Sequence, residues 1–291
     1  MSAPAYAQVA PGGAAVRPGG VPPWLGRLGS RPLNAYAVLG FAYLFAPIVV
    51  IVLFSFNAPR GKFNLVWQHF TLDSWSHPFA KRELTDALVK SLQVALIATV
   101  VATILGTLIA IALARYRFRG GALVGLLLVL PLTTPEIVMG ASLLNLFVKT
   151  DVQRSFWTIV IAHIMFSVSF VALTVKARIR GFDWTLEDAA MDLGARPWRT
   201  FRKVTLPLIV PGILAAALLS FSLSIDDFII TTFTSGQEVT FPLQIAGAFQ
   251  REISPQINVL ATMILVVSVG LMGGGSYLKA RREREASIDH R

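Results

Sequence analysis

The sequence predicts an all-α integral membrane protein with six membrane-spanning helices. Hydrophobic residues make up 54% of the 291-residue chain and charged residues only 14%, whereas soluble domains carry about 25% charged residues. Six apolar stretches reach the roughly 20 residues that a helix needs to cross a bilayer. Lipid offers backbone groups no hydrogen-bond partners, so these stretches are expected to be helices. They cover residues 33–56, 91–114, 122–148, 156–175, 208–229 and 257–278.

Polar segments flank and interrupt this membrane domain. We expect a disordered cytoplasmic tail over 1–32, a membrane domain over 33–281 with a polar loop at 176–207, and a second cytoplasmic tail over 282–291. Most of the 26 Lys and Arg residues fall in the tails, in that loop and in segment 115–119. The positive-inside rule therefore places both termini and the polar loop in the cytoplasm. The net charge of +10 then reflects topology and anionic lipid, and it requires no nucleic-acid partner.

The polar loop between the fourth and fifth stretches is the most informative segment. Residues 187–207 read EDAAMDLGARPWRTFRKVTLP, which predicts two short helices. Thr185 and Asp188 have the spacing of a capping box at the start of the first helix. Gly194 is placed to end that helix in a left-handed conformation, and Pro197 suits the first turn of the second. The first helix has one apolar face, made of Leu186, Ala189, Ala190 and Leu193.

This loop resembles the cytoplasmic coupling loop of ABC-transporter permeases, whose pattern is EAA, three residues, Gly, nine residues and Ile-x-Leu-Pro. The positions that match are Ala189, Ala190, Gly194, Leu206 and Pro207. Asp188 replaces the Glu of the pattern, and Val204 replaces the Ile. The resemblance implies the type I importer permease fold, with coupling helices that dock on a separate ATPase. The docking residues that it implies are the five matched residues together with Glu187 and Asp188. An apolar face alone would suit packing on the chain's own membrane helices equally well, but the full spacing match favours docking.

Four further stretches look like the spermidine/putrescine branch of ABC permeases, and specifically like the second of its two permease subunits. They are residues 112–118, 135–140, 224–228 and 253–258, and the similarity extends over about residues 33–280. It implies a multi-pass protein of the bacterial cytoplasmic membrane that forms half of the path of a polyamine importer. The implied partners are a second permease subunit, two ATP-binding subunits and an extracytoplasmic polyamine-binding protein. The chain itself would bind no cofactor, because ATP and magnesium would be held by the ATP-binding subunits.

Glu136 is an acidic residue deep inside an apolar stretch, where ionisable side chains are costly and often functional. Pro131 and Pro135 are expected to interrupt the helix around it, with Thr134 as a cap for the half that follows. Glu136 has two compatible interpretations. It stabilises the end of a broken helix, or it faces a transport path, because broken helices often border such paths.

Asp226 and Asp227 form the second acidic feature, near the outer end of the fifth stretch. We expect them at the outer mouth of the path, where they would attract a cationic substrate. Ordinary interfacial acids in contact with water are the alternative interpretation. Adjacent residues on a helix point in different directions, so the sequence leaves open whether both face the path.

Enzymatic functions find little support in the sequence. The chain contains no P-loop, H-E-x-x-H or G-x-S-x-G motif and no cysteine, and its four histidines lack metal-ligand spacing. His163 lies in the fourth stretch, where a single imidazole is typical of an interhelical hydrogen bond. Three alternatives stay open: an ABC permease for another small solute such as an iron or organic-cation complex, a stand-alone channel or secondary transporter, and a membrane-bound enzyme.

Overall fold

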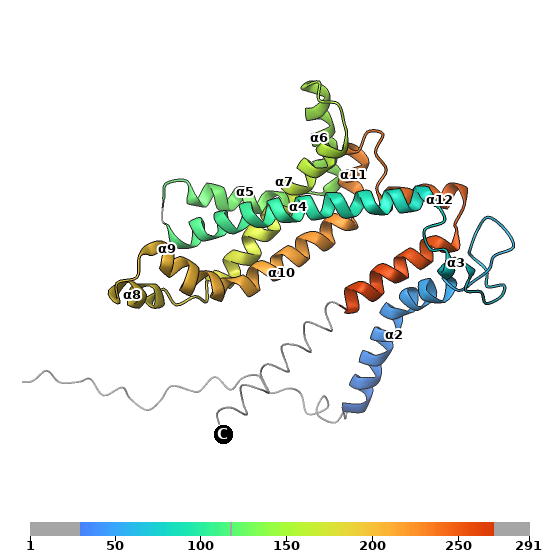
Figure 1. The fold of residues 1–291 in the computed structure, drawn as a ribbon, viewed down its shortest axis with the longest axis horizontal. Coiled ribbons are helices and arrows are strands. Elements are labelled where there is room, and N and C mark those ends of the chain that lie inside the picture. Colours follow the sequence, from blue (N-terminus) through green and yellow to red (C-terminus); the bar gives the residue numbers. More distant parts are fainter. Residues whose placement is uncertain (1–29, 117, 271–291) are drawn as a thin grey trace, which may run out of the picture. The chain divides into compact units, whose positions relative to one another are not determined.

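The computed structural model describes residues 30–116 and 118–270, and their regular elements are helices (Figure 1). Two isolated β-bridges, Asn57–Phe70 and Phe63–Ile253, are the exceptions among these residues. The helices are α2 (Ser30–Phe54), α3 (Asp73–Ser76), α4 (Arg82–Arg115), α5 (Gly121–Thr133), α6 (Glu136–Lys149), α7 (Phe156–Ile179), α8 (Thr185–Asp192), α9 (Pro197–Thr200), the π-helical segment η1 (Phe201–Thr205), α10 (Leu206–Ile225), α11 (Ile229–Thr234) and α12 (Phe241–Arg251). A last apolar helix spans Pro255–Gly270.

Five of the six predicted membrane spans correspond to long apolar helices or to the bent pair α5–α6, whereas the sixth corresponds to the shorter apolar helix Pro255–Gly270 among the described residues. Within residues 30–116 and 118–270, four helices are long and apolar enough to cross a membrane, and α5 with α6 makes a fifth if this bent pair counts as one span. The four are Pro32–Phe54, Arg82–Arg115, Phe156–Ile179 and Pro197–Ile225. The predicted sixth span is described as far as Gly270. Its expected continuation to 278, residues 1–29 of the expected tail and residues 282–291 lie outside the described residues.

The described residues divide into two compact units, with the boundary between Leu53 and Phe54. Most of α2 belongs to the first unit, and its stretch Pro32–Phe54 has the length and hydropathy of a membrane span. Its large apolar side chains are exposed along the helix. Such a helix suits a lipid environment, where an apolar surface needs no water-facing side. The second unit contains all the residues that the sequence singles out as functional.

The third predicted span is broken, as expected from its prolines. α5 and α6 meet at an angle of 107°. Only Pro135 marks the break, because Pro131 is accommodated inside α5, so the expectation that both prolines interrupt the helix is wrong. Thr134 precedes Pro135 and is extended, with φ −78° and ψ 130°, as expected for a residue before proline. The bend therefore follows from the Thr134–Pro135 step.

The core of the second unit is built from α4, α7 and α10, which pack side by side (Figure 1). Fully buried small and branched side chains fill it, including Ala102 and Ala110 of α4, Val171 of α7 and Ala216 of α10. Gly106 lies between the two alanines on the same face of α4. Small residues at four-residue spacing let helix backbones approach closely, which is a common way to join helices in membranes.

We expect Gly106→Ala to lower the thermal unfolding midpoint of the purified protein, because α4 and α7 are too close there for a methyl group. A Cβ at Gly106 would lie 2.7 Å from Val171 Cγ1 and 3.0 Å from the backbone nitrogen of Ala172. Overpacking of this kind costs about 1–3 kcal/mol. Gly125→Ala on α5 is the matched control, since a Cβ there has nothing within 4 Å. Equal midpoints for the two variants would contradict close packing of α4 on α7.

Candidate coupling surface and transport path

The end of α8 has the left-handed cap that its sequence predicts. Gly194 has a φ of +85°. Its amide donates to the carbonyl of Met191 at 2.9 Å, and the amide of Ala195 donates to the carbonyl of Ala190 at 3.0 Å. This pair of bonds defines a Schellman motif. Pro197 then begins α9, as expected, so the turn between the two short helices is fixed by glycine and proline.

The start of α8 differs from the predicted capping box. Thr185 is the first residue of the helix, and its amide and hydroxyl both donate to the Asp183 carboxylate, at 3.0 and 2.8 Å. The bond from the Thr185 hydroxyl holds the pKa of Asp183 below its ordinary value. The acceptor therefore precedes Thr185, and the Thr185–Asp188 spacing was misleading. Asp188 and Glu187 still lie in the first turn of α8, where the helix dipole favours acidic side chains.

α8 shows its apolar residues to the outside and buries an acid. Leu193 is 90% exposed, and Leu186 and Ala189 are also exposed. Ala190 and Gly194 border a hollow of about 330 Å³, whose other lining residues include Arg199 and Lys203. The rest of this surface includes Trp198 of α9, which is exposed and stacks on Phe201. We call Leu186 and Ala189 of α8, Leu193 directly after it and this hollow the coupling surface.

Glu187 is the buried acid, with 3% of its surface exposed. Its Oε2 lies 2.9 Å from Nη2 of Arg115, the last residue of α4, and its Oε1 accepts a hydrogen bond from the hydroxyl of Thr205 in η1. The Arg115 guanidinium also lies over the Trp184 ring, 5.7 Å from its centroid. The side chain of Glu187 thus points into the protein, although its position beside the EAA-like residues suggested a docking residue.

Leu206 and Pro207 mark the point where the polar loop becomes a membrane helix. Pro207 has no amide hydrogen, so a regular α-helical bond to residue 203 cannot form. The preceding turn, η1, is π-helical, and the amide of Leu206 donates to the carbonyl of Phe201. Leu206 packs beside the buried core cluster, whereas Pro207 is exposed. The Leu-Pro pair therefore sets the register in which α10 begins.

Glu136 is the first residue of α6, and its side chain is exposed. Thr134 does not cap α6 as expected, because its hydroxyl donates backwards to the carbonyl of Leu130 at 2.7 Å. Within the described part of the chain, the Glu136 carboxylate has no hydrogen-bond or ion-pair partner. The Glu136 carboxylate is therefore exposed at the bend between α5 and α6, and it is unpaired among the described residues.

Asp227 lies in a buried polar network that joins three helices. One carboxylate oxygen accepts bonds from the amide and hydroxyl of Thr231 in α11, both at 2.8 Å, and lies 3.3 Å from His163 Nε2 in α7. His163 also contacts the hydroxyls of Ser224 in α10, at 2.7 Å, and of Thr231, at 3.0 Å. The Asp227 side chain is 8% exposed. The interhelical role expected for His163 is confirmed by these contacts, and Asp227 lies two residues before α11, which begins at Ile229.

Asp226 has a different environment from Asp227, although the two are adjacent. It follows the last residue of α10, is exposed, and lines a largely apolar hollow of about 490 Å³. Aromatic and aliphatic side chains such as Phe228, Phe249 and Ile264 form the wall. Neither Asp227 nor Glu136 lines this hollow. The fifth predicted span ends at Ile225 rather than 229, because the chain leaves the helix at Asp226.

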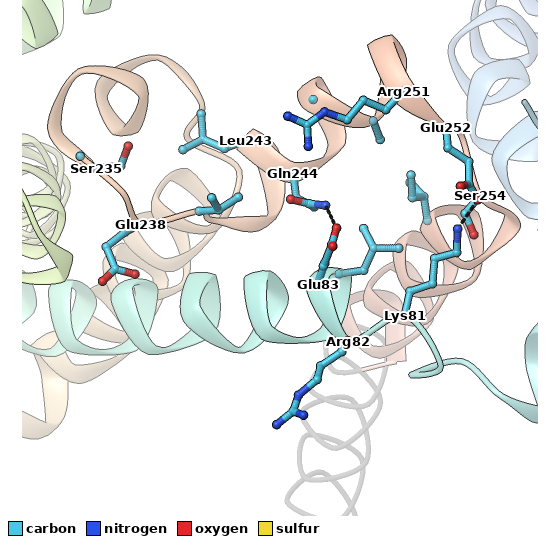
Figure 2. Close-up of a pocket in the computed structure, with 16 residues that line it drawn as sticks. Lys81, Arg82, Glu83, Ser235, Glu238, Leu243, Gln244, Arg251, Glu252 and Ser254 are labelled. Carbon is cyan, nitrogen blue, oxygen red and sulfur yellow. Dashed lines mark hydrogen bonds and ion pairs between the residues drawn. The ribbon is translucent and has the colours of Figure 1, made fainter. Parts of the chain in front are cut away.

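A larger cavity, of about 780 Å³, lies between the first turn of α4 and α12 (Figure 2). Three basic residues (Lys81, Arg82 and Arg251) and three acidic residues (Glu83, Glu238 and Glu252) line it. Each acid has a partner: Glu252 pairs with Lys81, Glu238 pairs with Lys90, and Glu83 Oε2 lies 3.4 Å from Gln244 Nε2. The cavity is at the opposite end of α4 from Arg115. Because its acids already have partners, it offers a polycation less net attraction than the exposed Asp226 carboxylate.

The fold and this polar loop define a class: an all-α membrane subunit with the architecture of importer permeases. Two solved structures share the fold. A bacterial ABC transporter that imports the acidic polysaccharide alginate matches with a TM-score of 0.59 and 15% identity, covering 87% of this chain and 96% of that one. An amino acid ABC transporter matches with a TM-score of 0.55 and 20% identity, covering 73% and 100%. At these identities the likeness concerns the fold alone.

Residues 89–279 match the family described as the inner membrane component of binding-protein-dependent transport systems, and the chain belongs to this family. The spermidine/putrescine transport system permease protein PotC of Escherichia coli is 40% identical over 79% of this chain and 86% of its own length. PotC of Haemophilus influenzae is 38% identical over 82% and 93%. The putrescine transport system permease protein PotI of Escherichia coli is 37% identical over 87% and 92%.

Proposed function

We propose that this chain is the permease subunit of an ATP-driven polyamine importer and forms half of its translocation path. The observation that carries the proposal is the coupling surface, where Leu193 at the end of α8 is exposed while Glu187 in its first turn is buried. A helix in water would have the opposite arrangement, so the coupling surface is expected to be covered by a partner. The names of the relatives supply the substrate class.

The proposed partners follow from this class of importer. They are a second permease subunit, two ATP-binding subunits that hold ATP and magnesium, and a binding protein outside the membrane. The coupling surface would contact an ATP-binding subunit in the cytoplasm, and both termini would lie on the same side, in agreement with the distribution of Lys and Arg. The cavity at the start of α4 would then face the outside.

A polyamine combines ammonium groups with short aliphatic segments, and the hollow beside Asp226 has both kinds of partner. The carboxylate would attract an ammonium group, while the Phe228 and Phe249 rings would contact methylene groups. Glu136 would provide a second carboxylate at the α5–α6 bend. In an alternating-access cycle, ATP binding and hydrolysis on the partner would move α8 and α9, and α4, α7 and α10 would rock around the path.

The proposal is tested with the complete complex in lipid nanodiscs. We expect its ATPase activity to be stimulated by the binding protein loaded with spermidine or putrescine. An iron complex or a quaternary ammonium ion should give only the basal rate. Stimulation by one of those solutes and not by polyamines would contradict the substrate class. ATP hydrolysis that is unaffected by the loaded binding protein, whatever the solute, would contradict the importer itself.

Glu136→Gln should slow polyamine uptake by roughly tenfold, which corresponds to about 1.4 kcal/mol at the barrier. The variant removes a charge that has no partner in the described part of the chain, so packing should be preserved. Uptake and the thermal unfolding midpoint are measured on the same preparation. A lower midpoint with unchanged uptake per folded complex would instead identify Glu136 as a residue that stabilises the helix end.

A further inference from the structure

Arg115, Glu187 and Thr205 form a polar contact between three segments that are distant in sequence. Arg115 ends α4, Glu187 lies in the first turn of α8, and Thr205 ends η1 directly before α10. We call this set the coupling clamp. Both oxygens of the Glu187 carboxylate are used, one by Arg115 Nη2 at 2.9 Å and one by the Thr205 hydroxyl. The clamp therefore ties α8 to both α4 and α10.

The clamp lies against aromatic side chains that shield it. The Arg115 guanidinium lies over the Trp184 ring, and this ring packs edge-on against Phe182, with centroids 4.8 Å apart. Phe182 and Trp184 also pack against the buried cluster of α4, α7 and α10. Arg115 keeps about a third of its side-chain surface exposed, whereas the Glu187 side chain is 4% exposed. Within the clamp, Glu187 is thus buried, whereas Arg115 is partly exposed at the surface.

A buried carboxylate without its partner is strongly unfavourable, so the contacts of Glu187 resist separation when α8 is displaced. The backbone alone gives α8 a looser attachment. On one side it is joined to α7 by the turn at 180–184, and on the other it is joined to α9 by the Gly194 turn. The clamp adds side-chain connections between α8 and the ends of two core helices.

We infer that the coupling clamp transmits displacement of α8 to α4 and α10, so that Arg115 and Glu187 are positioning residues for the coupling of ATP hydrolysis to transport. The inference rests on the proposed function, because it requires an ATP-binding subunit that moves α8. The coupling surface would receive the movement on the outer face of α8. The clamp would pass it on from the inner face to the helices that line the path.

The test measures how many substrate molecules are transported per ATP hydrolysed by the complete complex in proteoliposomes. Glu187→Gln retains an acceptor for Thr205 but loses the charge that pairs with Arg115. Arg115→Lys retains the positive charge but loses the planar guanidinium. We expect transport per ATP to fall at least roughly fivefold in Glu187→Gln, the lower end of typical coupling effects. Arg115→Lys should show a smaller loss, and the ATP-binding subunit should still copurify with both variants.

A double-variant cycle separates transmission from general damage. If Arg115 and Glu187 act through each other, Arg115→Gln with Glu187→Gln together should lose no more transport per ATP than the worse single variant. Asp86→Asn is the matched control, because Arg82 and Asp86 form an exposed pair, 3.9 Å apart, at the opposite end of α4. This variant should keep the parental ratio.

Thr205→Val keeps the shape of the side chain and removes only its hydroxyl. It provides an independent test if Glu187→Gln yields too little complex, and we expect a reduced ratio here as well. Parental transport per ATP in Thr205→Val and Arg115→Lys would overturn the inference, as would strictly additive losses in the cycle. A parent complex that neither hydrolyses ATP nor transports any solute would instead contradict the proposed function, so the two failures are distinguishable.

Discussion

Asp227→Ala is expected to destabilise the protein by about 1.5–3 kcal/mol, the range for losing hydrogen bonds to a charged group. The Asp227 carboxylate accepts two bonds from Thr231 and contacts His163. Without it, buried donors on α7 and α11 have no partner at that position. The thermal unfolding midpoint and the yield of monodisperse protein should both fall.

Asp226→Ala is the matched control, since it removes the same group from the neighbouring exposed position. Its midpoint should stay at the parental value, while polyamine uptake should slow. The loss of uptake should be greater at low ionic strength if Asp226 attracts substrate over a distance, because the Debye length is about 8 Å at physiological salt and about 30 Å at 0.01 M. Indistinguishable midpoints for Asp226→Ala and Asp227→Ala would contradict the buried network.

Gly194→Val is expected to leave the protein inserted and folded but to weaken the association of the ATP-binding subunit, and with it transport. Gly194 has a φ of +85°, a conformation that costs an L-residue about 1–2 kcal/mol and a β-branched residue more. A Cβ at this position would have nothing within 4 Å. The expected effect therefore comes from backbone strain, which would distort the Schellman turn and displace Leu193 and Ala190.

Gly194→Asn is the control for this interpretation, because asparagine tolerates the left-handed region better than other non-glycine residues. Copurification of the ATP-binding subunit and substrate-stimulated ATP hydrolysis should decrease in the order Gly, Asn, Ala, Val. Normal stimulated hydrolysis in the Val variant would contradict the role of this turn. So would a structure of the complex in which residues 186–203 touch no partner chain.

The local features of the fold were predictable because each depends on neighbouring residues. Apolar length identifies the long helices, the Thr134–Pro135 step produces the bend before α6, and Gly194 with Pro197 determines the turn after α8. The predicted ends of helices are less accurate where contacts with another segment of the chain determine the local structure. α10 ends at Ile225, and Asp227 beyond it contacts His163 and Thr231; a count of apolar residues cannot detect these contacts.

The candidate site was predictable at the level of the segment but not of each side chain. The spacing of Ala189, Ala190 and Gly194 located the coupling surface. The burial of Glu187 could not be read from the sequence, because its partner Arg115 lies at the end of a different membrane helix. The close contact at Gly106 has a signal in the sequence, namely the small residues Ala102, Gly106 and Ala110 at four-residue intervals.

The most direct test of ATP-driven polyamine import is uptake of radiolabelled spermidine into proteoliposomes that contain the complete complex. ATP is enclosed inside the vesicles, and the binding protein is added outside. We expect uptake against a concentration gradient that requires this chain, ATP and the binding protein, and that unlabelled putrescine inhibits. ATP-dependent accumulation of another solute without spermidine uptake would contradict the polyamine assignment. Spermidine uptake that persists without the ATP-binding subunits would contradict ATP-driven import.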